Sequence, residues 1–163
     1  KGLEIKNPII TLFFIIIFSN PSLCPSCLIL TISNNLSNSV GIGPNLFLAK
    51  VALDNEAKNN QDQIAYWNED DIKTKLHKIT PLSKIWSIGS KTEKKLNKMG
   101  IYNLGDVSNT PKEILLSSFG ILGGELHDHS NGIDTSDIRD KYVLSRLLWD
   151  LGIADEFADS LNK

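Results

Sequence analysis

Residues Trp86–Val107 read WSIGSKTEKKLNKMGIYNLGDV, and this stretch decides the fold of the central part of the chain. The glycine in Ser87–Gly89 indicates a tight turn, and a helix is predicted to follow it. Ser90 and Glu93 have the spacing of a capping box, in which each side chain accepts a hydrogen bond from the backbone N–H of the other residue. Gly100 stands where a glycine commonly ends a helix. The stretch therefore predicts a helical hairpin whose second helix runs from Ser90 to this glycine.

A second hairpin is predicted directly after the first. Thr110–Glu113 has the pattern of another capping box, with its proline at the first helical position. The helix that it opens is predicted to stop at Gly120. Ile121–Gly124 then indicates a turn into a further helix that ends near Gly132. Two helix–turn–helix units, each with a glycine turn, are thus expected in tandem.

The lysines are concentrated in the middle of this 163-residue chain, although its formal net charge is −2. Residues 72–98 hold eight lysines and one acid. A turn that leads into a helix presents N–H groups without intrahelical partners, at the positive end of the helix dipole, where phosphate binds well. With Lys91, Lys94 and Lys95 close by, the first hairpin predicts sequence-independent binding of a DNA backbone. The alternative is a solvated lysine face beside a glycine, Gly89, that only permits a tight corner.

Two other motifs could suggest metal or redox chemistry. Cys24 and Cys27 form one C-x-x-C pair, which could be a redox couple or half of a zinc site, but no second pair completes four ligands. His127 and His129 have a poor spacing for one metal ion on a helix. We interpret the cysteines as incidental and the histidines as surface residues.

Residues 1–38 differ in composition from the rest, with many Ile, Leu, Phe, Ser, Asn and Pro residues. The apolar run Ile9–Phe18 is shorter than the ~20 residues that span a bilayer. It could be the core of a signal peptide, but no small-x-small cleavage site follows it. We expect residues 1–35 to pack poorly, and the protein to be cytoplasmic and without a membrane partner.

From Ser39 onward the pattern becomes regular. A strand end at Val40–Ile42 and a turn precede a largely buried helix at Leu46–Lys58. The G-x-G in this turn lacks the third glycine of a dinucleotide fingerprint, so we interpret it as a turn alone. Lys50 on the buried helix needs an anion nearby, which is either Asp54 one helical turn away or a bound phosphate. Two further elements are predicted, a short strand at Gln63–Trp67 and a helix at Asp70–Ile79.

Three segments, in this order and at these separations, resemble Y-family translesion DNA polymerases, and most closely the UmuC/UvrX-like UV-damage repair proteins. They are SVGIGPNLFLAKVALDNEAK (39–58), IWSIGSKTEKKLNKMGIYNLGDV (85–107) and FGILGGELHDHSNGID (119–134). The resemblance covers roughly residues 39 to 142. It implies four parts: an atypical apolar segment (1–38), a palm remnant (39–79), a helix–hairpin–helix thumb (80–141) and an acidic C-terminal segment (142–163).

The resemblance also implies site residues. Lys50 matches the lysine of an N-x-x-x-A-K pattern that contacts the triphosphate of the incoming nucleotide in the family, with Asn45 and Ala49 at the other matching positions. The family's thumb holds the backbone phosphates of primer–template DNA. The DNA-binding residues expected from the hairpin and the resemblance are Ile88, Gly89, Ser90, Lys91, Lys94 and Lys95.

The catalytic part of the family pattern is not found in the sequence. Family members hold two Mg²⁺ ions with palm carboxylates, but residues 1–38 offer only Glu4, and no little-finger domain is recognisable after Tyr142. We therefore expect a fragment, monomeric, that binds DNA in translesion synthesis and repair without polymerase chemistry of its own. A sliding clamp is a further partner in the family. The alternative is a non-catalytic interaction protein, or a non-functional remnant, with an apolar docking segment.

The expected fold class follows from these parts. It is α+β and mostly α, with a small palm strand and helix followed by a compact helical thumb.

Overall fold

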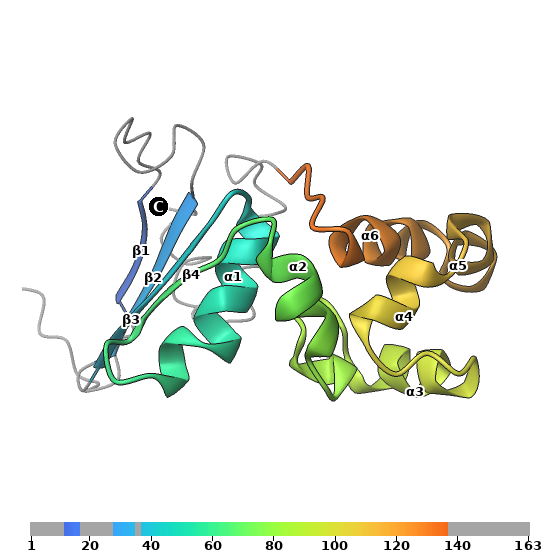
Figure 1. Cartoon of the computed structure of the whole chain (residues 1–163), viewed down its shortest axis with the longest axis horizontal. Helices are drawn as coiled ribbons and strands as arrows, with labels where there is room; N and C mark the ends of the chain where they lie inside the picture. Colours follow the sequence, from blue (N-terminus) through green and yellow to red (C-terminus); the bar gives the residue numbers. More distant parts are fainter. Residues whose placement is uncertain (1–11, 17–27, 35–36, 137–163) are drawn as a thin grey trace, which may run out of the picture.

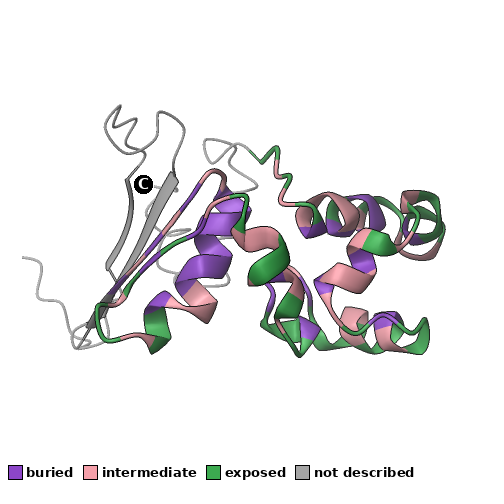
Figure 2. Cartoon of the chain, in the orientation of Figure 1, coloured by how far each residue is buried: buried purple, intermediate pink, exposed green. Residues whose placement is uncertain are grey.

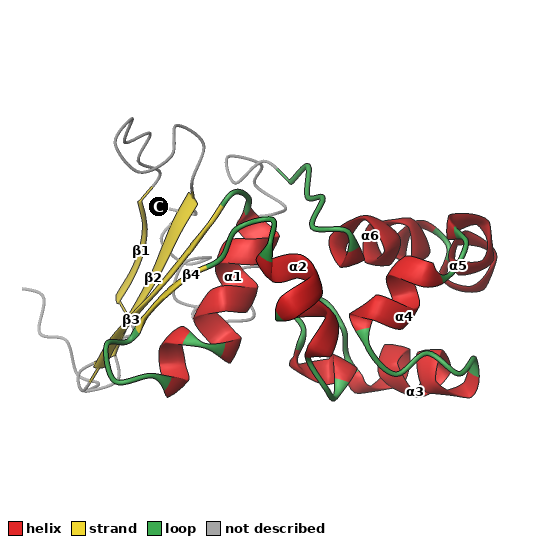
Figure 3. Ribbon diagram, in the orientation of Figure 1, coloured by secondary structure: helices red, strands yellow, loops and turns green. Residues whose placement is uncertain are grey.

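The computed structural model of the protein describes residues 12–16, 28–34 and 37–136, with side chains from Ser39 onward (Figure 1). These residues form a sheet, a helix that covers one face of it, and a group of short helices beyond that helix (Figures 1 and 3). The predicted α+β, mostly α class is confirmed. The predicted acidic C-terminal segment (142–163) and both cysteines lie outside the described residues.

The sheet has four strands in the order β1-β2-β3-β4. β1 (Leu12–Ile16), β2 (Leu28–Asn34) and β3 (Ser37–Gly43) pair antiparallel, whereas β4 (Ile64–Tyr66) pairs parallel with β3. The expectation that residues 1–35 pack poorly is therefore wrong for the backbone of β1 and β2. Apolar runs rich in Ile and Phe favour strands.

Helix α1 (Leu46–Asn55) lies against the sheet, and the two glycines of β3 explain how closely it approaches. A Cβ at Gly41 would lie 2.2 Å from the carbonyl oxygen of Ala49, and one at Gly43 would lie 2.6 Å from the backbone nitrogen of Ala49. The G-x-G of the sequence thus serves helix–strand packing. The interpretation of the G-x-G as a turn is wrong, because both glycines lie within β3 and the turn follows them.

The segment between α1 and the first hairpin is made of short turns. It contains η1 (Ala57–Asn59), α2 (Asp71–Thr74), η2 (Leu76–Lys78) and η3 (Leu82–Lys84). The helix predicted at Asp70–Ile79 is thus split into α2 and η2. The break turns Leu76 into the core, where it is fully buried.

Four helices follow: α3 (Ser90–Lys98), α4 (Leu104–Asn109), α5 (Lys112–Phe119) and α6 (Ile121–Ser130). The predicted end of α3 is confirmed. Gly100 has φ +80, its N–H donates to Asn97, and the N–H of Ile101 donates to Leu96. These two bonds form a Schellman motif, and the buried side chains of Ile101 and Leu96 complete it.

Both predicted capping boxes are wrong. Gly89 is the N-cap of α3, so Ser90 is the first helical residue and no side chain caps this end. The hydroxyl of Thr110 donates to the carbonyl of Asp106 instead of capping α5. The capping box that does form, between Asn103 and Asp106, opens α4, a helix that was not predicted. Its N-x-x-D spacing is a recognisable signal.

The predicted turn at Ile121–Gly124 is also wrong, because Gly120 alone joins α5 to α6. It has φ +63, a conformation that favours glycine. Gly123 lies inside α6, where an added Cβ would come within 2.0 Å of the carbonyl oxygen of Leu115. This glycine therefore allows a close helix crossing and does not form a turn.

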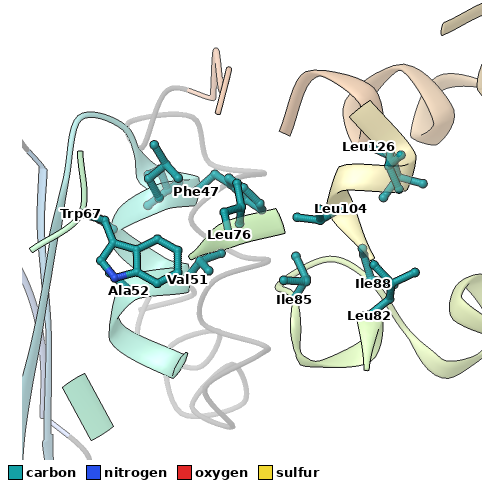
Figure 4. Close-up of a cluster of buried hydrophobic side chains, with 14 of the residues drawn as sticks. Phe47, Val51, Ala52, Trp67, Leu76, Leu82, Ile85, Ile88, Leu104 and Leu126 are labelled. Carbon is teal, nitrogen blue, oxygen red and sulfur yellow. The ribbon is translucent and has the colours of Figure 1, made fainter. Parts of the chain in front are cut away.

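One apolar core runs from α1 into the hairpins (Figure 4). It includes Phe47 and Val51 of α1, Leu76 of η2, and Ile85 and Ile88 at the turn of the first hairpin. Burial is nearly continuous along α1, whereas α3 is mostly exposed (Figure 2). The core thus holds α1 and the first hairpin in a fixed relation.

Candidate nucleic-acid interface

The turn of the first hairpin packs against the core through two isoleucines and leaves its glycine exposed. Ile85 and Ile88 are 2% and 4% exposed, and the N–H of Ile88 donates to the carbonyl of Ile85 at 3.0 Å. Ser87 between them has φ +75, a conformation uncommon for a residue other than glycine. Ile88 was predicted to bind DNA, but its side chain is a core residue, so only its backbone can take part.

The N-terminus of α3 presents free N–H groups. Its first three amides belong to Ser90, Lys91 and Thr92, which have no acceptor within the helix, and no side chain caps them. The carbonyl of Gly89 accepts from Glu93, so the helix begins cleanly at this glycine. These N–H groups are the hydrogen-bond donors that a phosphate oxygen requires.

Gly89 itself faces open space. It is exposed, its φ of −81 suits any residue, and an added Cβ would meet nothing within 4 Å. Neither backbone conformation nor internal packing therefore requires a glycine here. A molecule that approaches this turn closely from outside would require one.

The predicted lysines of α3 differ in their surroundings. Lys91 and Lys94 are exposed, and their side chains make no ion pair or hydrogen bond within residues 39–136. Lys95 instead donates to the carbonyl of Ser118 and lies over the ring of Phe119, with 4.5 Å from Nζ to the ring centroid. Lys95 thus connects α3 to the end of α5, and its charge is already partly used inside the fold.

A cavity of about 500 Å³ separates the first turn from α1. Its lining includes three residues predicted as site residues, namely Lys50, Ile88 and Gly89. Lys58 and Lys84 also line it, and neither was assigned a site role from the sequence. A helical spacing of two turns from Lys50 was a signal for Lys58, and the basic run was one for Lys84.

Asp54 lies between Lys50 of α1 and Lys58 of η1. Its Oδ2 lies 2.5 Å from Nζ of Lys50, and its Oδ1 lies 2.6 Å from Nζ of Lys58. The Lys50 side chain is 5% exposed, so this cation is buried and paired. Asp54 and a bound phosphate were the two anions expected near Lys50, and Asp54 is the one that pairs with it in the structure.

The far end of the helical hairpins returns to the N-terminus of α1. Asn45 caps α1 by accepting from the N–H of Leu48, and its Nδ2 donates to the carbonyl of Gly132 at 2.7 Å. The N–H of Phe47 donates to Oδ2 of Asp134 at 2.9 Å. A carboxylate at this position meets the positive end of the α1 dipole. We call this contact, made by Asn45, Phe47, Gly132 and Asp134, the latch.

His129 completes the latch. Its ring stacks on Phe47 at 4.1 Å, and Nε2 lies 3.7 Å from Oδ1 of Asp134. Burial raises the pKa of Asp134, but His129 and the hydroxyl and N–H of Ser136 outweigh it and lower the pKa to about 2. The prediction of a surface histidine is wrong for His129, whose side chain is 13% exposed. The fold, and not H-x-H spacing, determines its partner.

A helix terminus with free amides, exposed lysines and a core-anchored turn is the arrangement of a helix–hairpin–helix motif. Comparison with known sequences agrees, because the IMS family HHH motif matches residues 69–101. Within residues 12–16, 28–34 and 37–136, no helix has the length and apolar character needed to cross a membrane.

Part of the chain is similar to DNA-repair proteins of known sequence. The chain is 47% identical over 100 residues to UvrX, a protein of Bacillus subtilis (strain 168) named for UV-damage repair; the match covers 61% of this chain and 24% of UvrX. It is 46% identical over 100 residues to the DNA repair protein homolog YobH and 38% identical over 99 residues to DNA polymerase IV 2, both of Bacillus subtilis (strain 168). These matches cover 61% of this chain in each case, with 46% of YobH and 24% of the polymerase.

The matched segment is therefore homologous to the Y-family DNA polymerases and their DNA-repair relatives, and the resemblance read from the sequence is confirmed. The chain spans between about a quarter and about a half of the length of these relatives.

Proposed function

We propose that this chain binds the sugar–phosphate backbone of primer–template DNA through its first hairpin, in translesion synthesis and DNA repair. The observation that carries the proposal is the open N-terminus of α3, where free N–H groups follow a glycine that the fold does not require. Lys91 and Lys94 add unpaired charge on the same short helix.

The chemistry of this end predicts the mode of binding. N–H groups and lysines contact phosphate oxygens but read no base edges, so affinity is independent of sequence. Each neutralised phosphate releases condensed counterions, so affinity falls steeply with salt. A chain of net charge −2 binds DNA in this way because the positive charge is local.

The expected role of Lys50 in binding a nucleotide triphosphate stays part of the proposal. Lys50 lines the cavity beside the hairpin, but its charge is paired with Asp54. A triphosphate must therefore compete with this carboxylate or bind beside it.

The described residues do not fit the two Mg²⁺ ions of the family. No group of three His, Cys, Asp or Glu side chains within residues 39–136 could hold a metal ion. Asp54, the carboxylate in the cavity, has both oxygens occupied by lysines. The proposal for this part of the chain is accordingly limited to binding DNA and nucleotide.

Charge reversal in α3 tests the proposal. We expect the double variant Lys91→Glu/Lys94→Glu to weaken binding of a fluorescent duplex, measured by anisotropy, and to flatten the salt dependence by about two units of slope. Lys73→Glu/Lys78→Glu, at two exposed lysines of the same basic run, is the matched control with the same change of net charge. Equal effects of the two changes would show that only net charge matters and would refute binding at the hairpin.

A further inference from the structure

We infer that Lys95 is a positioning residue, which holds the turn of the second hairpin against α3 and does not itself contact DNA. This inference deepens the proposed function and rests on it. The Lys95 side chain reaches from α3 to the end of α5, where Nζ donates to the carbonyl of Ser118 and lies 4.5 Å from the ring centroid of Phe119. One cation thus joins the helix proposed to bind DNA to the hairpin that follows it.

The end of α5 is a favourable place for a cation. Ser118 lies in the last turn of this helix, where the carbonyl groups have no N–H partner within the helix. These carbonyl groups also form the negative end of the helix dipole. Lys95 therefore supplies both a hydrogen-bond donor and a positive charge where the helix lacks them.

The ring of Phe119 fixes the place of this contact. Phe119 packs against the apolar core, so its ring is held in position. An ammonium group within about 6 Å of the centroid is attracted to the face of an aromatic ring. Gly120 follows directly and, with φ +63, forms the turn into α6. The contact of Lys95 therefore acts at the turn of the second hairpin.

Few other contacts hold α3 in its orientation to the second hairpin. Leu96 is the only buried residue of α3. Within residues 39–136, no other side chain of α3 makes a hydrogen bond or ion pair with α5 or α6. Loss of the Lys95 contact would therefore allow α3 to change its angle to the second hairpin, and its free N–H groups would move with it.

Lys94 is the neighbouring lysine and provides the contrast. It is exposed, and its side chain has no ion pair or hydrogen bond within the same residues. Removal of a lysine that contacts a phosphate lowers the slope of log K against log salt by about one unit. Removal of a positioning lysine weakens binding alike at every salt concentration, because no phosphate contact is lost.

The test compares Lys95→Met, Lys95→Arg and Lys94→Met in the full chain. One arm measures anisotropy of a fluorescent primer–template duplex across a salt series. The other arm records the amide NMR signals of Phe119 and Gly120 without DNA, so it reports the contact of Lys95 independently of binding.

We expect Lys95→Met to lower duplex affinity by about two- to fivefold at each salt concentration, which is the size of effect that an exposed cation–π contact supplies. The salt slope should stay unchanged, and the signals of Phe119 and Gly120 should move. Lys95→Arg should restore both the affinity and the signals, because a guanidinium group also donates to a carbonyl and stacks on an aromatic ring. Lys94→Met should instead lower the slope by about one unit and leave the two signals in place.

Three results for Lys95→Met would each overturn the inference: a slope that falls as it does in Lys94→Met, an unchanged affinity, or unmoved signals of Phe119 and Gly120. Failure of the proposed function is separate, because it shows as unchanged DNA binding in Lys91→Glu/Lys94→Glu.

Discussion

At the scale of single residues, the glycines of this chain serve different purposes that their sequence context does not distinguish. Gly41 and Gly123 permit close packing, Gly100 and Gly120 adopt positive φ, and Gly89 does neither. A turn signal in the sequence was therefore correct at Gly100 and Gly120 and wrong at Gly123, where tertiary packing requires the small residue.

Gly89→Ala separates function from stability. Because the added methyl group meets no atom and φ is ordinary, we expect the free energy of unfolding to change by less than about 0.5 kcal/mol. The methyl group would stand where a phosphate approaches the N–H groups of α3, so duplex affinity should fall. Urea unfolding and anisotropy on the same sample measure both quantities.

Gly123→Ala is the opposite case. Its methyl group would overlap the carbonyl of Leu115, and overpacking of this kind costs about 1–3 kcal/mol. We expect urea unfolding to show this loss. A Gly123→Ala variant as stable as the wild type would contradict the close crossing of α5 and α6.

At the scale of elements, the sequence predicted where helices exist better than how they begin. The ends of α3 and α5 were predicted correctly from Gly100 and Gly120, because few other residues adopt the positive φ found at these helix C-termini. Serine and threonine can cap a helix or bind other backbone groups, as Thr110 does, and the choice depends on contacts made elsewhere.

The capping box of α4 gives a prediction at this scale. Asn103 accepts from the N–H of Asp106, and the Asp106 carboxylate accepts from the N–H of Asn103. We expect Asn103→Ala to lower the free energy of unfolding by about 1 kcal/mol. The same measurement on Ser90→Ala should show a smaller change, because Ser90 caps nothing.

At the scale of the whole molecule, the latch joins the segment at the end of α6 to the start of α1. Asp134 is 87 residues from Phe47 in sequence, yet it binds the N-terminus of α1. No local pattern predicts such a pairing, and the same holds for the cavity that brings Lys84 to Lys58. The sequence predicted individual lysines of the hairpin as site residues, whereas the contacts between distant segments required the structure.

The latch predicts a pH dependence of stability. Because the pKa of Asp134 is lowered from 3.8 to about 2, the folded chain binds fewer protons than the unfolded chain between these values. Its contribution is complete above about pH 4 and is lost as the pH falls toward 2. We expect Asp134→Asn to be less stable than the wild type at neutral pH and to approach it in acid.

Urea unfolding across this pH range measures the effect. Asp62→Asn, a change at an exposed aspartate, is the control and should follow the wild-type curve. A constant difference between Asp134→Asn and the wild type from pH 7 to 2 would contradict a role of the charge.

The central claim is that backbone phosphates bind the N-terminus of α3, and amide chemical shifts during a duplex titration test it most directly. We predict that the N–H signals of Gly89, Ser90, Lys91 and Thr92 move most, and that duplexes of unrelated sequence move them alike. Shifts that leave these four amides unchanged while others in the chain respond would contradict the account.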